Sequence, residues 1–159
     1  MRRALVSALA FALALGCAGG PRPRADVALE VRGAVDRPIA LSPAEFRGLP
    51  HVELTVAGTR YAGVPVADVL RLAGVPLGEA LRGESLELYV VAEAADGYRV
   101  VYSLAELDPA TSSSAILIVD AENGQPLSAH DGPLRLVAPG DLRHARWVRQ
   151  LLRIVIQRG

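Results

Sequence analysis

Every periodic segment of this chain is short, and this feature limits the fold more than any other. Fifteen glycines and eleven prolines interrupt 159 residues, so a turn signal soon ends each apolar pattern. Residues 115–119 (AILIV) form a continuous apolar run, which is typical of a strand buried on both faces. Further strands, mostly marked by apolar–polar alternation, are predicted over residues 27–31, 39–41, 52–56, 85–92, 98–102, 134–138 and 148–156.

The predicted helices are equally short. Ser42 with Glu45, and again Ser103 with Glu106, have the spacing of a capping box at the start of a helix. Apolar residues three and four positions apart predict another helix over 66–73, followed by a helical turn over 77–81. The long crossover helices of a regular parallel sheet are absent from this pattern. The sequence therefore predicts a mixed α+β domain, rich in strand, with short helices.

The chain begins with a segment typical of a secretory signal. Arg2 and Arg3 precede an apolar run that is too short to span a bilayer. The run ends at Cys17, the only cysteine, in a partial match to the site where lipoproteins are cleaved and acylated. We expect a signal peptide or lipoprotein leader over 1–17, a Gly/Pro/Arg-rich linker over 18–26 and one domain over 27–157.

Two fates of Cys17 remain open at this point. Acylation would attach the protein to a membrane of the cell envelope, whereas ordinary signal-peptidase cleavage near residues 17–20 would release it. Both predict an exported protein, either periplasmic or lipid-anchored. Either way, the folded domain has no cysteine for metal binding or nucleophilic attack.

The charges are balanced in number but unevenly distributed. Seventeen basic residues, all of them arginines, face seventeen acids, and this balance argues against general nucleic-acid binding. Residues 79–131 contain ten acids and two arginines, whereas residues 135–158 contain six arginines and one acid. The acidic stretch is typical of a solvated surface. The arginine-rich stretch is either solvated or lines an anion site, because guanidinium groups match carboxylate and phosphate geometry.

Several common active sites are not indicated. His51, His130 and His144 lie far apart without metal-ligand spacing, so we predict no metal site. The serine run 112–114 is not a nucleophile elbow, and no glycine-rich nucleotide loop is present. Residues 96–98 (DGY) indicate a hairpin turn.

Residues 123–152 contain the strongest indication of a binding site. Arg135 alternates with Leu134 and Leu136 on a predicted strand, which would hold its guanidinium in place. A loop that follows Pro139-Gly140 then supplies three further donors, so the candidate anion-binding residues are Arg135, Arg143, His144 and Arg146. The alternative is that Arg135 pairs with an acid such as Asp131 or Asp120 and has only a structural role.

The sequence also resembles the oxidoreductase molybdopterin-binding domain of the sulfite oxidase superfamily, in particular its small exported bacterial members. The resemblance covers nearly all of residues 27–156, and its motifs occur in order. They are residues 31–41 (VRGAVDRPIAL), 61–70 (YAGVPVADVL), 96–98 (DGY), 123–127 (NGQPL), 132–140 (GPLRLVAPG) and 146–148 (RWV).

The resemblance implies a mixed, strand-rich fold and a molybdopterin cofactor. In the family, molybdenum is held by the dithiolene of the pterin and by one protein cysteine, and the enzymes transfer oxygen atoms to or from small oxyanions or sulfoxides. That cysteine normally follows the strand that corresponds to residues 51–56. Here the strand runs through Ala57-Gly58-Thr59 directly to Tyr61. Arg146 also stands where many members have Lys before Trp.

Two hypotheses for the function follow. The first is an exported molybdopterin-dependent oxidoreductase-like domain that binds a pterin cofactor or another small anion, with the usual catalysis in question because the cysteine is missing. The second is a non-catalytic periplasmic module that retains the fold for ligand binding or for contact with an envelope protein. No nucleic-acid partner is expected in either case.

Overall fold

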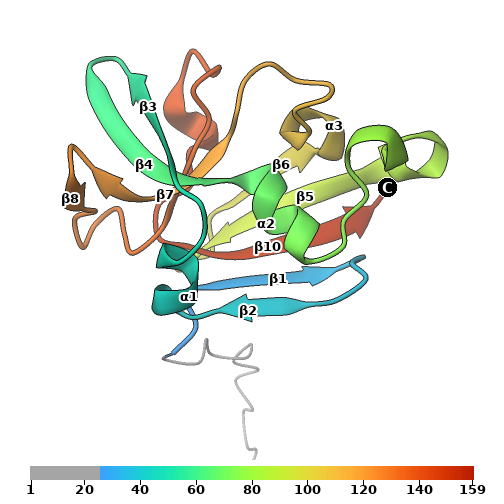
Figure 1. Cartoon of the computed structure of the whole chain (residues 1–159), viewed down its shortest axis with the longest axis horizontal. Helices are drawn as coiled ribbons and strands as arrows, with labels where there is room; N and C mark the ends of the chain where they lie inside the picture. The colour runs from blue at the N-terminus through green and yellow to red at the C-terminus, as the bar shows by residue number, and fades with distance from the viewer. Residues whose placement is uncertain (1–25) are drawn as a thin grey trace, which may run out of the picture.

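The longest strand, at the C-terminal end of the chain, lies in the middle of the first of two sheets. The computed structural model describes residues 26–159, and Figure 1 shows both sheets. The first sheet has the order β2-β1-β10-β5-β6, in which only the β1–β10 pair is parallel. Its strands are β1 (Leu29–Gly33), β2 (Ile39–Leu41), β5 (Leu88–Ala94), β6 (Arg99–Ser103) and β10 (Leu151–Arg158).

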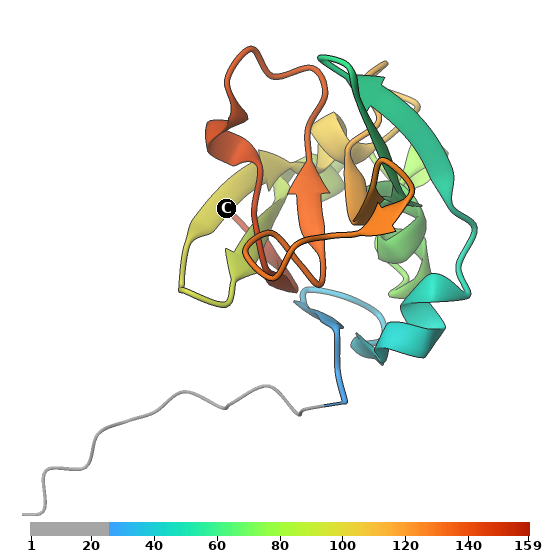
Figure 2. The same cartoon turned by 90° about the vertical axis from the view of Figure 1, so that its left-hand side faces the viewer.

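The second sheet is antiparallel throughout. It has the order β3-β4-β7-β8, and β9 also pairs with β7. Its strands are β3 (Val52–Val56), β4 (Thr59–Pro65), β7 (Leu117–Glu122), β8 (Gln125–Pro126) and β9 (Arg135–Val137). Figure 2 shows the β3–β4 hairpin as a long twisted arm beside the rest of this sheet.

The helices are short, as predicted. They are α1 (Pro43–Arg47), α2 (Val66–Leu72) and α3 (Leu104–Leu107), together with the 3₁₀ turns η1 (Gly78–Ala80), η2 (Gly83–Glu87) and η3 (His144–Arg146). Both predicted capping boxes are formed. Ser42 caps α1 with Glu45, and Ser103 caps α3 with Glu106. The predicted α+β, strand-rich fold is therefore confirmed.

The core lies between the two sheets. A row of apolar side chains crosses the first sheet through the paired residues Val31, Ile154, Ala92 and Val100. These residues form one buried cluster with α2 and with β7, in which residues 117–119 are fully buried. The run at 115–119 was predicted to be buried on both faces, and its last three residues confirm this.

Two details of the predicted strands are wrong. Leu86 was assigned to a strand, but it lies in η2 and is exposed, because the strand starts only at Leu88. Apolar–polar alternation over 148–156 would also place Leu152 on the core face, with Ile154 and Ile156. A register shift between Leu151 and Arg153 instead places Leu151 in the core, and Leu152 is half-buried.

The predicted leader and linker fall almost entirely within residues 1–25, outside the described part of the chain. Among residues 26–159, no helix is long and apolar enough to cross a membrane.

Close approach of two strands explains the glycine in the motif at 61–65. A Cβ on Gly63 of β4 would lie 2.2 Å from the carbonyl oxygen of Ile118 and 2.5 Å from the Cα of Val119, both on β7. These are rigid backbone atoms of the central strand pair, so a methyl group fits only if the strands separate.

We therefore predict that Gly63→Ala lowers the free energy of unfolding by about 2 kcal/mol or more, as expected for overpacking. Gly48→Ala is the matched control, because its added methyl would lie 3.4 Å from the Glu45 carbonyl oxygen, which is ordinary van der Waals contact. The control should change stability little. Urea denaturation of both variants measures the difference, and equal stabilities would contradict the packing argument.

Candidate functional site

A single pair of backbone hydrogen bonds joins β9 to the segment that leads into β10. The Leu136 amide donates to the Val148 carbonyl at 2.8 Å, and the Val148 amide donates to the Leu136 carbonyl at 3.2 Å. In this antiparallel bridge, the neighbours on one side are Arg135 and Arg149. Residues directly opposite each other share a face, so the bridge brings the two arginines together.

The two arginines differ in exposure. The Arg135 side chain is only 10% exposed, whereas that of Arg149 is 54% exposed. The guanidinium carbon of Arg135 lies 5.2 Å from the ring centre of Trp147, within the range of a cation–π contact. Strand β9 and this tryptophan therefore hold Arg135 in place, while Arg149 reaches toward solvent.

One carboxylate lies between the two guanidinium groups. Asp131 Oδ1 is 3.4 Å from Arg135 Nη1 and 3.1 Å from Arg149 Nε, and Oδ2 accepts a hydrogen bond from the Ser128 hydroxyl at 3.1 Å. Among the described residues, neither the buried Oδ1 nor the buried Arg135 Nε makes a contact with hydrogen-bond geometry. A buried donor without a partner is costly, so Arg135 has unused hydrogen-bonding capacity.

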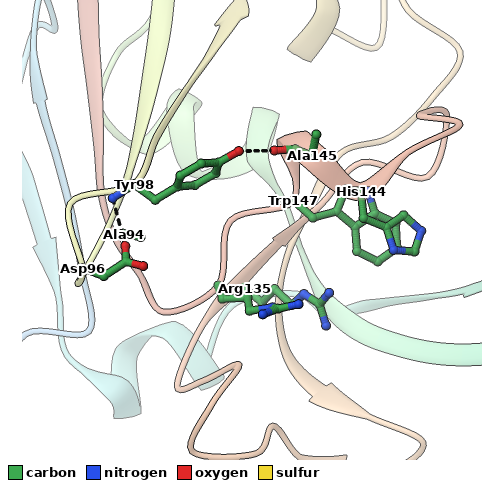
Figure 3. A pocket seen from close by; sticks show the side chains of 8 residues that line it. Ala94, Asp96, Tyr98, Arg135, His144, Ala145 and Trp147 are labelled. Atoms are coloured by element: carbon green, nitrogen blue, oxygen red, sulfur yellow. Dashed lines mark hydrogen bonds between the residues drawn. The ribbon is translucent and has the colours of Figure 1, made fainter.

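A pocket of about 300 Å³ opens beside Arg135. Figure 3 shows Arg135 across the pocket from Tyr98, with Trp147 and His144 to one side. The His144 ring stacks on Trp147 with centroids 3.8 Å apart, and the Tyr98 hydroxyl donates to the Ala145 carbonyl at 2.5 Å. The full lining is Ala94, Asp96, Tyr98, Arg135, His144, Ala145, Trp147 and Arg149.

The structure brings together only two of the four predicted anion-binding residues. Arg135 and His144 line this pocket. Arg143 is exposed in the preceding loop and does not line it. Arg146 points into a different region, beside α3. The predicted convergence of all four donors on one pocket is therefore not what the geometry shows.

Arg146 clamps the loop before η3 onto α3. It donates to both carboxylate oxygens of Asp141, at 3.0 and 2.6 Å, and to Glu106 at 2.8 Å. Its guanidinium also lies over the Tyr102 ring, 4.7 Å from the centre. The hydrogen bonds that Arg146 donates to Asp141 and Glu106 raise its pKa further above the ordinary value. These contacts use its donors, so Arg146 supports the η3 turn that presents His144 and Trp147.

Most of the remaining C-terminal arginines are paired with acids. Arg153 lies 2.8 Å from Glu30 and 3.8 Å from Glu93 across the first sheet, and Arg158 pairs with Glu84. Apolar–polar alternation over residues 148–156 would place Arg149 and Arg153 on the same face of one strand. Instead, Gln150 has a positive φ of 46° and β10 starts only after it.

Sequence reasoning missed Arg149, Tyr98 and Asp96 as pocket residues. The motif at 96–98 was interpreted as a hairpin turn, and it is one, since Asp96 accepts a hydrogen bond from the Tyr98 amide at 2.9 Å. The same turn also forms a wall of the pocket. The alternative considered for Arg135, pairing with Asp131, is present, whereas Asp120 pairs with His51 at 3.3 Å.

The donor set of the pocket suits an anion better than a metal ion. Across residues 26–159, no cluster of three or more His, Cys, Asp or Glu side chains could hold a metal. Two guanidinium groups and an imidazole line one pocket, and Asp96 is the one acid in its lining. Guanidinium groups form forked hydrogen bonds with phosphate and carboxylate.

Comparisons with known proteins identify the fold and the family. In the crystal structure of the sulfane dehydrogenase SoxCD from Paracoccus pantotrophus, a chain matches with a TM-score of 0.64 and 20% identity, over 80% of this chain. This chain spans only 37% of that one. The family model for the oxidoreductase molybdopterin binding domain matches residues 55–158, and no curated protein matches.

These matches define a sulfite oxidase-type molybdopterin-binding fold. The chain belongs to the oxidoreductase molybdopterin binding domain family. The resemblance inferred from the motifs in the sequence is thereby confirmed.

The ion pair between Arg146 and Glu106 should make the stability of the fold depend on pH. Burial alone would raise the pKa of Glu106, but hydrogen bonds from Arg146 and Ser103 overcome this effect and lower the pKa below its ordinary value. A carboxylate with a lowered pKa stabilises the fold above its unfolded pKa of about 4.3 and loses that effect as the pH falls through the folded value.

Glu106→Gln should therefore lower stability at pH 7 by up to about 1 kcal/mol, since the pair is partly exposed. Glutamine can keep the capping box, so the change tests the charge. The difference from wild type should shrink as the pH falls below the unfolded pKa and vanish once the pH is below the lowered pKa of folded Glu106. Thermal unfolding from pH 3 to 7 measures it, with the exposed Glu79→Gln as control. A pH-independent difference would exclude the ionic explanation.

Proposed function

We propose that this protein is an exported oxidoreductase-type domain whose Arg135 pocket binds the phosphate of a molybdopterin-type cofactor or another small oxyanion. We further propose that no protein thiolate holds a metal there. The observation that carries the proposal is the buried Nε of Arg135, which has no hydrogen-bond partner among the described residues and belongs to a side chain that lines the pocket.

The pocket residues fit a phosphate group. A tetrahedral oxyanion would offer acceptors to Arg135 and to Arg149, the two arginines placed opposite each other by the Leu136–Val148 bridge. His144 adds a third nitrogen donor at the pocket wall. A volume of about 300 Å³ is at the lower end of the range for small-molecule sites.

The residues do not fit a metal held by a thiolate. The family resemblance places the ligating cysteine after the strand that corresponds to β3. In this protein β3 and β4 are joined by Ala57 and Gly58 alone, with φ values of 50° and 84°. The only cysteine, Cys17, lies outside the described residues. We therefore assign no oxygen-transfer step to this pocket.

That two-residue turn favours the second candidate function. A domain that kept the fold and the anion pocket but lost the loop for the metal ligand would act as a non-catalytic binding or interaction module. An envelope protein is the partner class that export implies. The proposed export rests on the leader at residues 1–17 and the linker at 18–26, before the domain at 27–157, with lipid attachment through Cys17 as one route to the envelope.

We predict that Arg135→Gln weakens binding of inorganic phosphate at least about tenfold, because it removes the fixed charge of the pocket. Arg143→Gln is the matched control: it removes the same charge from an exposed position that does not line the pocket, and should change affinity less than about twofold. Isothermal titration calorimetry at constant ionic strength gives the affinities.

Arg149→Gln is a second pocket variant, which tests the proposal even if Arg135→Gln does not fold. Its side chain is 54% exposed, so the variant should fold normally and still bind phosphate more weakly than wild type. If Arg135→Gln and Arg143→Gln bind equally well, the pocket is not an anion site and the proposal fails.

The choice between cofactor and other anion is tested on protein purified from a host that makes molybdopterin. Pterin that is retained by wild type and lost in Arg135→Gln supports the cofactor, and our proposal predicts no stoichiometric molybdenum with it. Phosphate binding without retained pterin supports the binding module. One molybdenum per chain would overturn the proposal that the site works without a thiolate.

A further inference from the structure

We infer that Asp131 is a built-in counter-anion that sets the affinity and charge selectivity of the Arg135 pocket, an inference that rests on the proposed function. The carboxylate neutralises one of the two pocket arginines. The pocket then has little excess positive charge, and it binds multiply charged anions less tightly than two arginines alone would.

The backbone geometry explains why a carboxylate is favourable at this position. Arg135 and Arg149 are direct neighbours across the Leu136–Val148 bridge, and like charges placed opposite each other destabilise a strand pair. Asp131 Oδ1 lies within 3.4 Å of one guanidinium and 3.1 Å of the other. It therefore relieves the repulsion in the protein without ligand.

The position of Asp131 is fixed from outside the pair. Ser128 donates to Oδ2 at 3.1 Å, and the Gln150 amide donates to the Asp131 carbonyl at 2.9 Å. Asp131 does not line the pocket, so a ligand has no need to displace it. The carboxylate and a bound anion would both interact with the same guanidinium groups, and their charges would repel each other.

The charge effect and the positioning effect of Asp131 have opposite signs. Removing the negative charge favours an anion bound within the roughly 10 Å range of weakly screened interaction. Losing the contact could disorder Arg135, but β9 and Trp147 still hold that side chain. Asparagine also keeps an oxygen for Ser128 and the guanidinium groups. We therefore expect the charge effect to dominate in Asp131→Asn.

The experiment compares sulfate and perchlorate, two tetrahedral anions that differ in charge. Coulomb energy is proportional to ligand charge, so Asp131→Asn should tighten perchlorate binding about threefold and sulfate binding about tenfold. Calorimetric titrations at fixed ionic strength measure both affinities. Glu79→Gln removes the same charge from an exposed residue of η1 and should leave both unchanged. Asp131→Ser is a second neutral variant should the first not fold.

Failure of the Asp131 inference and failure of the proposed anion pocket give different binding results. Suppose that wild type binds sulfate through Arg135. If Asp131→Asn then binds each anion with the same affinity as wild type, or with a lower one, Asp131 is a structural residue and the inference is wrong. An equal gain for both anions also contradicts it, because a charge effect must scale with ligand charge. If no variant binds sulfate, the proposed anion pocket itself fails.

Discussion

The candidate site depends on one backbone contact between the two sheets. The Leu136–Val148 bridge connects β9 of the second sheet to the segment that enters β10 of the first, and the Leu151 amide adds a hydrogen bond to the Leu134 carbonyl at 2.8 Å. Because β10 is paired on both sides, by β1 and β5, this contact is supported by a rigid sheet centre. It places Arg135 and Arg149 side by side, and Val148 lies two residues after the η3 turn that contains His144.

Arginine is abundant near this site, but most of the positive charge is neutralised locally. Asp141 and Glu106 bind Arg146, and Glu30 and Glu93 face Arg153. The acids that dominate residues 79–131 are therefore in part the partners of arginines that follow later in the chain. These partners are far apart in the sequence, which is why the charge pattern along the chain suggested more candidate anion-binding residues than line the pocket.

The fold could be predicted from the sequence more fully than the site. Capping boxes, glycine turns and the apolar run at 115–119 are local signals, and they identified α1, α3 and β7 correctly. Arg135 was found because it alternates with leucines on a strand. Arg149 was missed as a pocket residue because its place depends on the kink at Gln150 and on a bridge to β9, and neither has a local signature. Arg143 and Arg146 lie near His144 in sequence, but loop geometry turns them away from the pocket.

Different parts of the structure form the core of the domain and the turn where the family resemblance places the metal ligand. The core between the sheets is held by buried apolar residues and the β10 pairings, whereas the β3–β4 hairpin is an arm closed by a two-residue turn. The turn residues Ala57 and Gly58 are exposed, whereas Tyr61 of the same arm packs edge-on against Trp147 beside the pocket, with ring centres 5.8 Å apart. On the function proposed above, the domain would lack the loop for a metal ligand and keep an anion site beside β9, where Asp131 Oδ1 lies within 3.4 Å of both arginines.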